Sequence, residues 1–280
     1  ACFGILCTNM LRFRKLFPKQ TCSVIGMIHV DGLPGSPKYK GSIKEIIKNA
    51  LREALIYKDC KVDGIIVENM HDVPYIRPKD ISPETTSMMT RICMEVRKLI
   101  PENIACGIQI LAGCNKEALA VAKASDFNFI RSEGYIFSHI ADEGFIDGCS
   151  GNLLRYRKYI DSNDILIFAD MKKKHSSHAI TSDISISEAV KAAEFFLVDG
   201  VILTGTETGN PVDVDELNVA KGPVLIGSGV SFDNIASYAY ADAVIVGTNF
   251  KINGNWENAV AKNKVSDFMM KLEEIQKQRN

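Results

Sequence analysis

The sequence lacks the long apolar runs and the one-sided charge that would indicate a membrane protein or a nucleic-acid-binding protein. No hydrophobic stretch reaches the ~18 residues that a membrane-spanning helix requires. The chain of 280 residues carries 33 Lys and Arg against 34 Asp and Glu, which gives a formal net charge of -1. Recognition of nucleic acid usually needs a clearly basic domain or face. We therefore expect neither a membrane span nor nucleic acid as a partner.

Clustered cysteines are also lacking. The eight cysteines are scattered and form no CxxC pair, which argues against a structural zinc site. Cys60, Cys93 and Cys106 fall in apolar stretches of a long chain, where buried reduced thiols are more usual than disulfides. The cysteines are therefore predicted to be the reduced thiols of an intracellular protein.

Acidic residues are missing from the first 30 positions. Asp31 is the first of them, and four basic residues precede it, among them Arg12 and Arg14. An acid-poor start that contains arginine is typical of mitochondrial presequences. Residues 1–22 are therefore expected to be an N-terminal extension, either a targeting segment or a ragged or tagged terminus, ahead of one domain over residues 23–280. The expected location is the cytoplasm, with the mitochondrial matrix as the alternative.

Several motifs that identify common enzyme classes are absent. The chain has no GxSxG elbow, no HExxH pair and no Walker A loop, which argues against an elbow-type serine hydrolase, a zincin and a P-loop NTPase. No GxGxxG fingerprint follows the first expected strand, so a dinucleotide-binding Rossmann unit is disfavoured. No cofactor is predicted.

What the sequence contains is an alternation of short apolar runs and helix-periodic stretches. Helix starts are marked by capping sequences at Ser42–Glu45 and Ser185–Glu188, and by Ser82 followed by proline and glutamate. Eight strands with no spare segment predict a single (β/α)8 TIM barrel with a closed parallel sheet, rather than an open doubly wound sheet. The expected strands are residues 23–30, 62–69, 104–111, 127–131, 165–170, 200–204, 224–227 and 243–247.

Glycine turns follow the last three expected strands. In TIM barrels the loops after strands seven and eight commonly bind phosphate through backbone N–H groups and a helix N-terminus. Glycine permits the close backbone approach that an anion needs, although an ordinary turn uses glycine too. The sequence thus predicts a phosphate-binding set, which a lysine after the fifth strand could join. Its members are Gly205, Gly227, Ser228, Gly229, Gly247, Thr248 and Lys172.

Polar residues at the C-terminal ends of the strands should converge on one mouth of such a barrel. Glu68 and Asp170 each end an apolar strand, where a buried carboxylate needs a partner, and they are candidates for acid–base catalysis. Arg131 could neutralise one of them or stabilise developing negative charge, and His29 could orient or polarise a substrate. A purely structural role is the alternative for each of the four. Further polar strand-end residues are Asn69, Gln109 and Thr204.

Two long polar loops, residues 132–150 and 171–185, follow the fourth and fifth strands. Loops of this length are usually functional or disordered. His175 and His178 in the second loop have an i, i+3 spacing that could suit a metal. The first loop could be a lid over a phosphorylated substrate or a plain surface loop. Its candidate lid residues are His139, Asp142 and Glu143.

Several segments together resemble one protein family. They read MIHVDGLPGSP at 27–37, VDGIIVEN at 62–69, DVP at 72–74, LRYR at 154–157, FADMKKKH at 168–175, LIGSGV at 225–230 and VIVGT at 244–248. In these segments the chain is similar to the BtpA family, which is also named for photosystem I biogenesis and includes the SgcQ-like proteins. The resemblance implies a TIM barrel of unsettled chemistry, and members are sometimes described as similar to phosphoribosylanthranilate isomerase. The third loop, AGCN at 112–115, departs from the bacterial Arg-Asn-Asp pattern, which puts a carried-over site there in doubt and indicates a eukaryotic-type branch.

Three functions are compatible with these features. The leading hypothesis is an isomerase or lyase that acts on a small phosphorylated, sugar-like metabolite at the C-terminal face. The second is a non-catalytic assembly factor that binds a protein or membrane complex through an exposed apolar patch of several hundred Å². The third is a hydrolase or aldolase with a divalent metal held by His29, Glu68 and Asp170. A homo-oligomer is compatible with all three.

Overall fold

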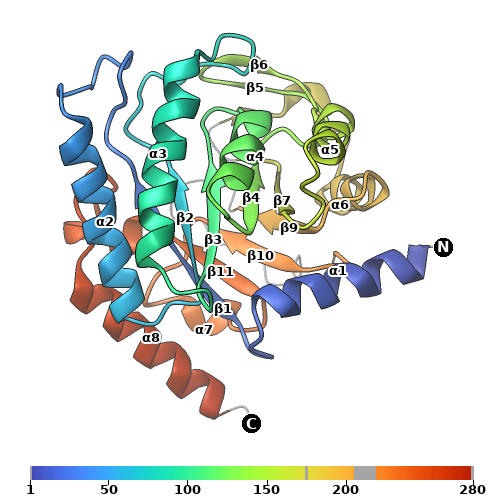
Figure 1. The fold of residues 1–280 in the computed structure, drawn as a ribbon. Coiled ribbons are helices and arrows are strands. Elements are labelled where there is room, and N and C mark those ends of the chain that lie inside the picture. Colours follow the sequence, from blue (N-terminus) through green and yellow to red (C-terminus); the bar gives the residue numbers. More distant parts are fainter. Residues whose placement is uncertain (1, 174–175, 205–218, 279–280) are drawn as a thin grey trace.

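The apolar runs form a closed barrel of eight parallel strands in the computed structural model, which describes residues 2–173, 176–204 and 219–278 (Figure 1). Around the barrel the strand order is β1-β11-β10-β9-β7-β4-β3-β2. The predicted TIM barrel is confirmed. The barrel strands are β1 (Ser23–His29), β2 (Gly64–Glu68), β3 (Ala105–Gln109), β4 (Phe129–Ser132), β7 (Leu166–Met171), β9 (Gly200–Leu203), β10 (Val224–Gly227) and β11 (Ala243–Val246).

Helices cover the outside of the barrel, and they begin where the capping sequences predict. The Ser42 side chain accepts a hydrogen bond from the Glu45 N–H, and Ser185 and Glu188 form a complete capping box. No helix in the described ranges is both long and apolar enough to cross a bilayer. The helices after β1 are α2 (Ile43–Asp59), α3 (Pro83–Leu99), α4 (Asn115–Ala124), α5 (Ser150–Tyr159), α6 (Ile186–Phe195), α7 (Ile235–Tyr238) and α8 (Lys262–Lys277).

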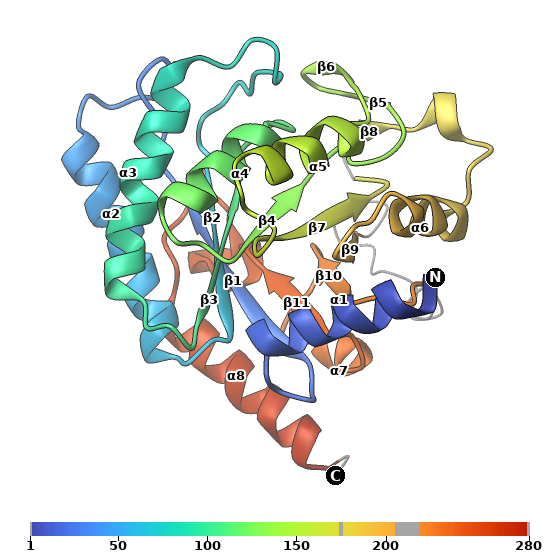
Figure 2. The ribbon, with the colours of Figure 1, turned by 45° about the vertical axis from the view of Figure 1, so that its right-hand side comes forward.

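The first helix, α1 (Cys2–Leu16), lies at the end of the barrel opposite the β5–β6 hairpin described below, in both ribbon views (Figures 1 and 2). Phe13 and Phe17 are fully buried and belong to the same core cluster as the side chains inside the barrel. Their ring centroids lie 5.9 Å from that of Phe168 and 6.0 Å from that of Phe129, respectively. The interval 1–22, expected to precede the domain, thus contributes two rings to the barrel floor.

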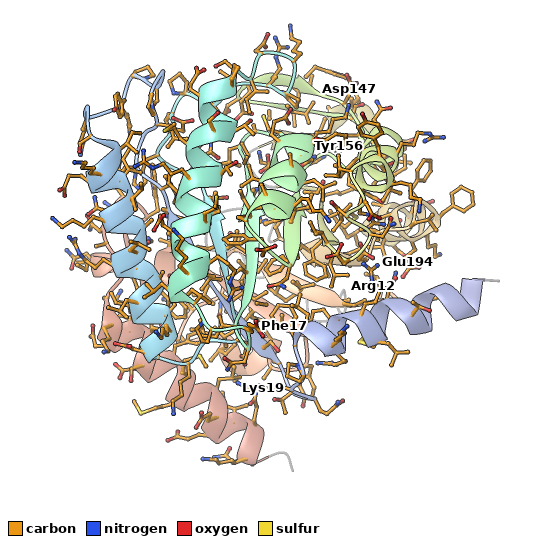
Figure 3. All side chains as sticks on the ribbon, in the orientation of Figure 1. Arg12, Phe17, Lys19, Asp147, Tyr156 and Glu194 are labelled. Carbon is orange, nitrogen blue, oxygen red and sulfur yellow. The ribbon has the colours of Figure 1, made fainter. Side chains whose placement is uncertain are left out.

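Basic residues of the same interval, among them Arg12 and Lys19, lie at the barrel floor (Figure 3), where they form ion pairs with aspartates. Arg12 pairs with Asp199, Arg14 with Asp242 at 2.5 Å, and Lys19 with Asp63 at 2.6 Å. Each aspartate directly precedes a strand and also accepts the backbone N–H of a neighbouring strand. Those N–H groups belong to Ile167, Val224 and Val24, at 2.9, 3.0 and 2.9 Å. Three of the four basic residues that suggested a presequence therefore stabilise the fold through ion pairs.

The two long loops contribute to a small antiparallel sheet at the opposite end of the barrel (Figure 2). The first loop forms a hairpin of β5 (His139–Ala141) and β6 (Gly144–Ile146), and the second adds β8 (Ser176–Ser177) along β5. Gly144 follows the two-residue turn with a φ of 103°, which side chains other than glycine rarely adopt. Both segments were expected as loops, the first as either a lid or a surface loop, and each contains at least one short strand instead.

The described cysteine side chains are free thiols, as expected. Cys22, Cys93, Cys106 and Cys114 are buried, and Cys60 and Cys149 are partly exposed. The side chains of the two cysteines near the N-terminus lie outside the described part of the structure. The free thiols agree with the predicted reduced state.

Candidate functional site

The candidate site begins with three polar side chains at the ends of neighbouring strands. His29 on β1 is paired in register with Glu68 on β2, and Glu68 is paired with Gln109 on β3. The three side chains therefore stand at one level of the sheet, at its C-terminal end. All three are buried, and Gln109 is 2% exposed. The prediction that strand-end residues converge is confirmed for this part of the mouth.

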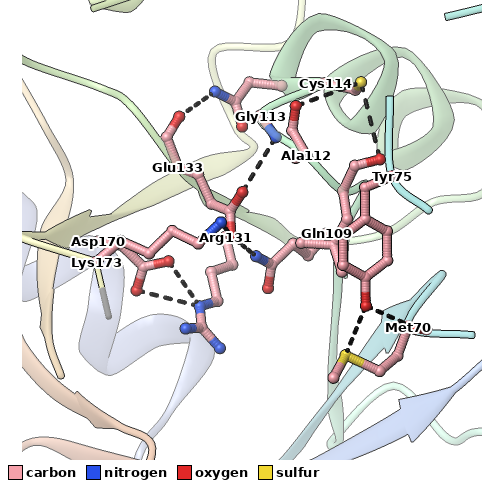
Figure 4. A network of polar contacts seen from close by, with 12 residues as sticks. Met70, Tyr75, Gln109, Ala112, Gly113, Cys114, Arg131, Glu133, Asp170 and Lys173 are labelled. Atoms are coloured by element: carbon pink, nitrogen blue, oxygen red, sulfur yellow. Dashed lines mark hydrogen bonds and ion pairs between the residues drawn. The ribbon is translucent and has the colours of Figure 1, made fainter. Parts of the chain in front are cut away.

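An ion pair between β4 and β7 forms the next part of the site (Figure 4). The Arg131 Nε donates to both carboxylate oxygens of Asp170, at 3.2 and 3.0 Å. Burial raises the pKa of Asp170 above its ordinary value, and the charge of Arg131 opposes this shift. Burial alone would lower the pKa of Arg131, but the nearby carboxylates of Asp170 and Glu68 raise this pKa above its ordinary value. Arg131 thus neutralises Asp170, which is one of the two roles predicted for this arginine.

Glu133 and Lys173 complete the polar network, although the sequence analysis did not select either as a site residue. The Lys173 Nζ lies 3.0 Å from Glu133 Oε1, and the Gln109 amide donates to the same oxygen at 3.1 Å. The other oxygen of Glu133 accepts the N–H of Gly113 at 3.1 Å (Figure 4). Strand alternation could have indicated Glu133, because it stands two positions after Arg131 and would share its face.

Glu68 is the carboxyl group of this network whose pKa lies near neutral pH. Burial raises its pKa to about 7, the Arg131 charge opposes the shift, and the negative charges of Glu133 and Asp170 add to it. At neutral pH the protonated and ionised forms of Glu68 are therefore both populated. A carboxyl group with this property can donate or accept a proton in a reaction.

His29 stands beside Glu68 as a neutral imidazole. Its Nε2 lies 3.7 Å from Glu68 Oε2, and its Nδ1 lies 3.2 Å from the carbonyl oxygen of Trp256. Burial, with a smaller contribution from the Lys251 charge, lowers the pKa of His29 to about 3. Since a carbonyl oxygen can only accept, the proton of the ring is assigned to Nδ1. The Nε2 lone pair then faces the carboxyl group of Glu68.

At high pH we expect the Glu68→Gln variant to be more stable than the wild type by about 3 kcal/mol. This figure follows from the rise of the Glu68 pKa from 4.5 to about 7, at about 1.4 kcal/mol per pKa unit. Below the ordinary pKa of 4.5 both folded and unfolded chains are protonated, so Glu68 has no effect there. As pH rises toward about 7 the unfolded chain loses its proton first, and the wild type loses stability. Urea unfolding at about pH 4 and about pH 8 measures the difference. The exposed Glu102→Gln is the control, and an equal gain at both pH values would contradict the assignment.

The predicted glycine turns lie against these side chains. A Cβ atom added to Gly227 would stand 3.6 Å from the Arg131 Nη2, and one added to Gly247 would stand 3.5 Å from the His29 Nε2. Ser228 and Gly229 follow β10 with φ values of 79° and 74°. Thr248 begins a short 3-10 helix, η3 (Thr248–Phe250), directly after β11. Gly205 lies outside the described residues.

The loop after β7 places two neighbouring lysines differently. Lys172 adopts a φ of 46° and donates from its ammonium group to the carbonyl oxygen of Ile184. Lys173 is the lysine that enters the polar network. Lys172 instead lines a cavity of about 30 Å³ together with Lys173, Asp170, His139 and His178. Its predicted role as a phosphate ligand stays a prediction.

Metal binding has little geometric support at this mouth. Within the described residues, no three His, Cys, Asp or Glu side chains are placed to share a metal ion. The alternative in which His29, Glu68 and Asp170 hold one divalent cation is therefore not supported. His178 stacks on His139 with ring centroids 5.4 Å apart, whereas His175 lies outside the described residues.

Comparison with known proteins identifies relatives across nearly the whole chain. The BtpA family matches residues 20–274. An uncharacterized mitochondrial protein of Caenorhabditis elegans, F13E9.13, is 46% identical over 91% of this chain and 94% of its own. The photosystem I biogenesis protein BtpA of Synechocystis is 35% identical over 90% of this chain and 88% of its own. The higher identity to the nematode protein agrees with the expected eukaryotic-type branch.

Solved structures show the same fold at low sequence identity. The phosphoribosyl anthranilate isomerase of Thermus thermophilus superposes with a TM-score of 0.56 at 9% identity, over 90% of this chain and 99% of its own. This likeness is one of fold. From the match over residues 20–274 and the 46% and 35% identity to its relatives, the chain belongs to the BtpA family.

Proposed function

We propose that this protein is an enzyme of the isomerase or lyase type that acts on a small phosphorylated metabolite at the C-terminal mouth of the barrel. One observation carries the proposal. Glu68, whose pKa is raised to about 7, is buried among His29, the Arg131–Asp170 pair and the glycine turns of β10 and β11. Buried carboxyl groups with strongly shifted pKa values are typical of catalytic sites.

The roles follow from the contacts of each group. Glu68 would take a proton from the substrate and return it, because both of its forms are populated near neutral pH. Arg131 would stabilise negative charge that develops in the reaction, while Asp170 holds its guanidinium group in place. This geometry favours a positioning role for Asp170 over the acid–base role that the sequence suggested. The neutral His29 would polarise or orient the substrate.

The glycine turns are the proposed phosphate site. Two consecutive residues with positive φ, Ser228 and Gly229, bend the backbone so that successive N–H groups can face one anion. Arg131 reaches this turn, and a side chain on Gly227 would crowd it, since its Cβ would approach Ile202 to 2.6 Å. The isomerase with the same fold is named for a phosphoribosyl compound, which agrees with this proposal.

A binding role without catalysis is the second candidate. Three consecutive apolar side chains at the end of α6, Phe195, Phe196 and Leu197, are exposed by 79%, 45% and 49%. Such a patch suits a partner protein. The Synechocystis relative is named for photosystem I biogenesis.

The mitochondrial matrix, given above as the alternative location, gains support from the name of the nematode relative. We propose this compartment for the chain. The cytoplasm, which the sequence analysis placed first, stays a prediction. Fractionation of cells that express the protein with its native N-terminus would distinguish the two compartments.

We expect phosphorylated metabolites to raise the unfolding temperature of the protein. A ligand at 100 times its dissociation constant adds about 2.7 kcal/mol of stability, which a thermal denaturation scan detects readily. In Ser228→Asp the shift should vanish, because a carboxylate would occupy the anion site.

Ser237→Asp introduces the same charge on the exposed face of α7 and serves as the control, in which the shift should persist. If no phosphorylated compound changes the transition even at millimolar concentration, the enzyme proposal fails and the assembly role is favoured.

A further inference from the structure

Buried polar atoms without a hydrogen-bond partner gather at the C-terminal mouth. Buried polar groups in folded proteins almost always have a partner, so such atoms need an explanation. Gln109 ends β3 and Thr204 follows β9, and three more belong to the small β6-β5-β8 sheet and its turn. Ser132 ends β4 and contributes one more such atom. Within the described residues, these atoms are Gln109 Oε1, Ser132 Oγ, Thr204 Oγ1, His139 Nε2, Glu143 Oε2 and Ser176 Oγ.

The orientation of the Gln109 amide is fixed by chemistry. Its nitrogen donates to the Glu133 carboxylate at 3.1 Å, and a carboxylate can only accept. The amide oxygen of Gln109 therefore points away from Glu133, as Figure 4 shows, and it has no donor among the described residues. Because Gln109 is 98% buried, that donor has to come from an ordered water molecule or from a bound ligand that displaces it.

Glu143 provides a second free acceptor from above the mouth. It stands in the turn between β5 and β6, and its charge acts on both Lys173 and Tyr75. The Glu133 charge acts on the same two groups, so Glu143 shares its electrostatic surroundings with the network that contains Gln109. The hairpin turn and the C-terminal end of β3 thus both offer acceptors at the mouth of the barrel.

The charge of this region disfavours a second anion. Four carboxyl groups, Glu68, Glu133, Glu143 and Asp170, act on the same network as Arg131 and Lys173, and among the described residues Lys251 adds a third positive charge that acts on Glu68. Asp170 already occupies Arg131, and Glu133 already occupies Lys173. A carboxylate or a second phosphate placed here would meet like charge, whereas a neutral hydroxyl group would supply the missing donors.

We propose that the substrate is a phosphorylated polyol or sugar monophosphate, whose hydroxyl groups donate to Gln109 Oε1 and Glu143 Oε2 at the end remote from the phosphate. This inference rests on the proposed function, because it takes the glycine turns as the phosphate site. It assigns Gln109 and Glu143 to substrate specificity. It also separates this site from one that would bind a phosphorylated acid.

Isothermal titration of the full chain tests the assignment. The probes are a pentose monophosphate, a hexose monophosphate, glycerol phosphate, phosphoglycerate, ethyl phosphate and inorganic phosphate. We expect at least one hydroxyl-rich monophosphate to bind more tightly than ethyl phosphate, and phosphoglycerate to bind no more tightly than inorganic phosphate. Gln109→Met should weaken the hydroxyl-rich ligand about ten-fold and leave inorganic phosphate unchanged. Glu143→Ala should act in the same direction.

Ser23→Ala is the matched control. Its hydroxyl group is also buried without a partner, but it lies at the start of β1, at the opposite end of the barrel. If inorganic phosphate binds but hydroxyl-rich compounds gain nothing over ethyl phosphate, or Gln109→Met weakens every ligand equally, the polyol inference is wrong while the phosphate site stands. If no phosphorylated probe binds, the proposed function fails with it.

Discussion

Replacing Lys251 by methionine is expected to lower the free energy of unfolding by about 3–5 kcal/mol, because it leaves a buried carboxylate without its counter-charge. Lys251 is fully buried, and its Nζ lies 2.8 Å from both oxygens of Glu53 on α2. Burial raises the pKa of Glu53, and Lys251 opposes that shift. Without the lysine, Glu53 keeps the Val260 N–H at 3.1 Å as a partner.

The double variant Lys251→Met with Glu53→Leu should recover most of this loss, because no buried charge remains. Urea unfolding of the four proteins in this cycle gives the coupling between the two residues. Lys262 and Asp59 provide a matched control on α8 and α2, since they form an exposed pair at 2.7 Å. Lys262→Met should cost no more than about 1 kcal/mol. A similar small cost for Lys251→Met would show that Glu53 becomes hydrated or protonated at no penalty.

The Glu53–Lys251 pair also acts on the candidate site. The Lys251 charge helps to lower the pKa of His29 to about 3. Removing that charge in Lys251→Met should therefore raise the pKa of His29, which an NMR titration of the imidazole would report. A protonated His29 would no longer offer its Nε2 lone pair to Glu68, so stability and chemistry are linked at this position.

Phe17→Ala is expected to destabilise the protein by about 3–5 kcal/mol, through loss of buried ring surface and the cavity that remains. The Phe17 ring lies against Gly64, where an added Cβ would stand 3.1 Å from its Cε1, and beside the ring of Phe129. Neither neighbour can move inward to fill the space, because both belong to barrel strands. Thermal and urea unfolding would measure the loss.

Leu11→Ala on the same stretch of chain is the control, since Leu11 is 66% exposed and should change stability by no more than about 0.5 kcal/mol. Phe17→Leu should restore part of the stability. Ligand binding should be unchanged in all three variants, because the floor lies at the other end of the barrel. A Phe17→Ala protein as stable as the wild type would mean that α1 does not close the floor in solution.

Sequence alone predicted the barrel because its strands are buried on both faces and its helices carry capping residues. The β5–β6 hairpin was missed because strands of three residues are too short to show a period. The role of α1 was missed because its arginines were interpreted by charge alone. Their partners, such as Asp199 and Asp242, lie more than 180 positions away in the sequence.

Site residues that end a strand could be predicted from the sequence. Site residues that lie past the end of a strand were harder to predict. His29, Glu68 and Asp170 belong to the strands themselves, and strand direction places them at the mouth. Lys173 lies two positions past the end of β7, where the positive φ of Lys172 redirects the chain. Spacing cannot tell which of several consecutive lysines turns inward after such a bend. Whether a buried polar atom such as Gln109 Oε1 lacks a hydrogen-bond partner depends on residues of other strands, which spacing along the chain does not place.

The pairing of β8 with β5 joins two loops into one body, although the paired residues lie 35 and 37 positions apart in the chain. Ile140 and Ala141 are paired with Ser177 and Ser176, so the hairpin cannot swing away unless it breaks these backbone contacts or carries the second loop with it. For a ligand that enters beneath the hairpin, the two loops would therefore open and close together. A cross-link between β5 and β8 would leave such an opening possible, whereas a cross-link from the hairpin to the barrel rim would block ligand binding.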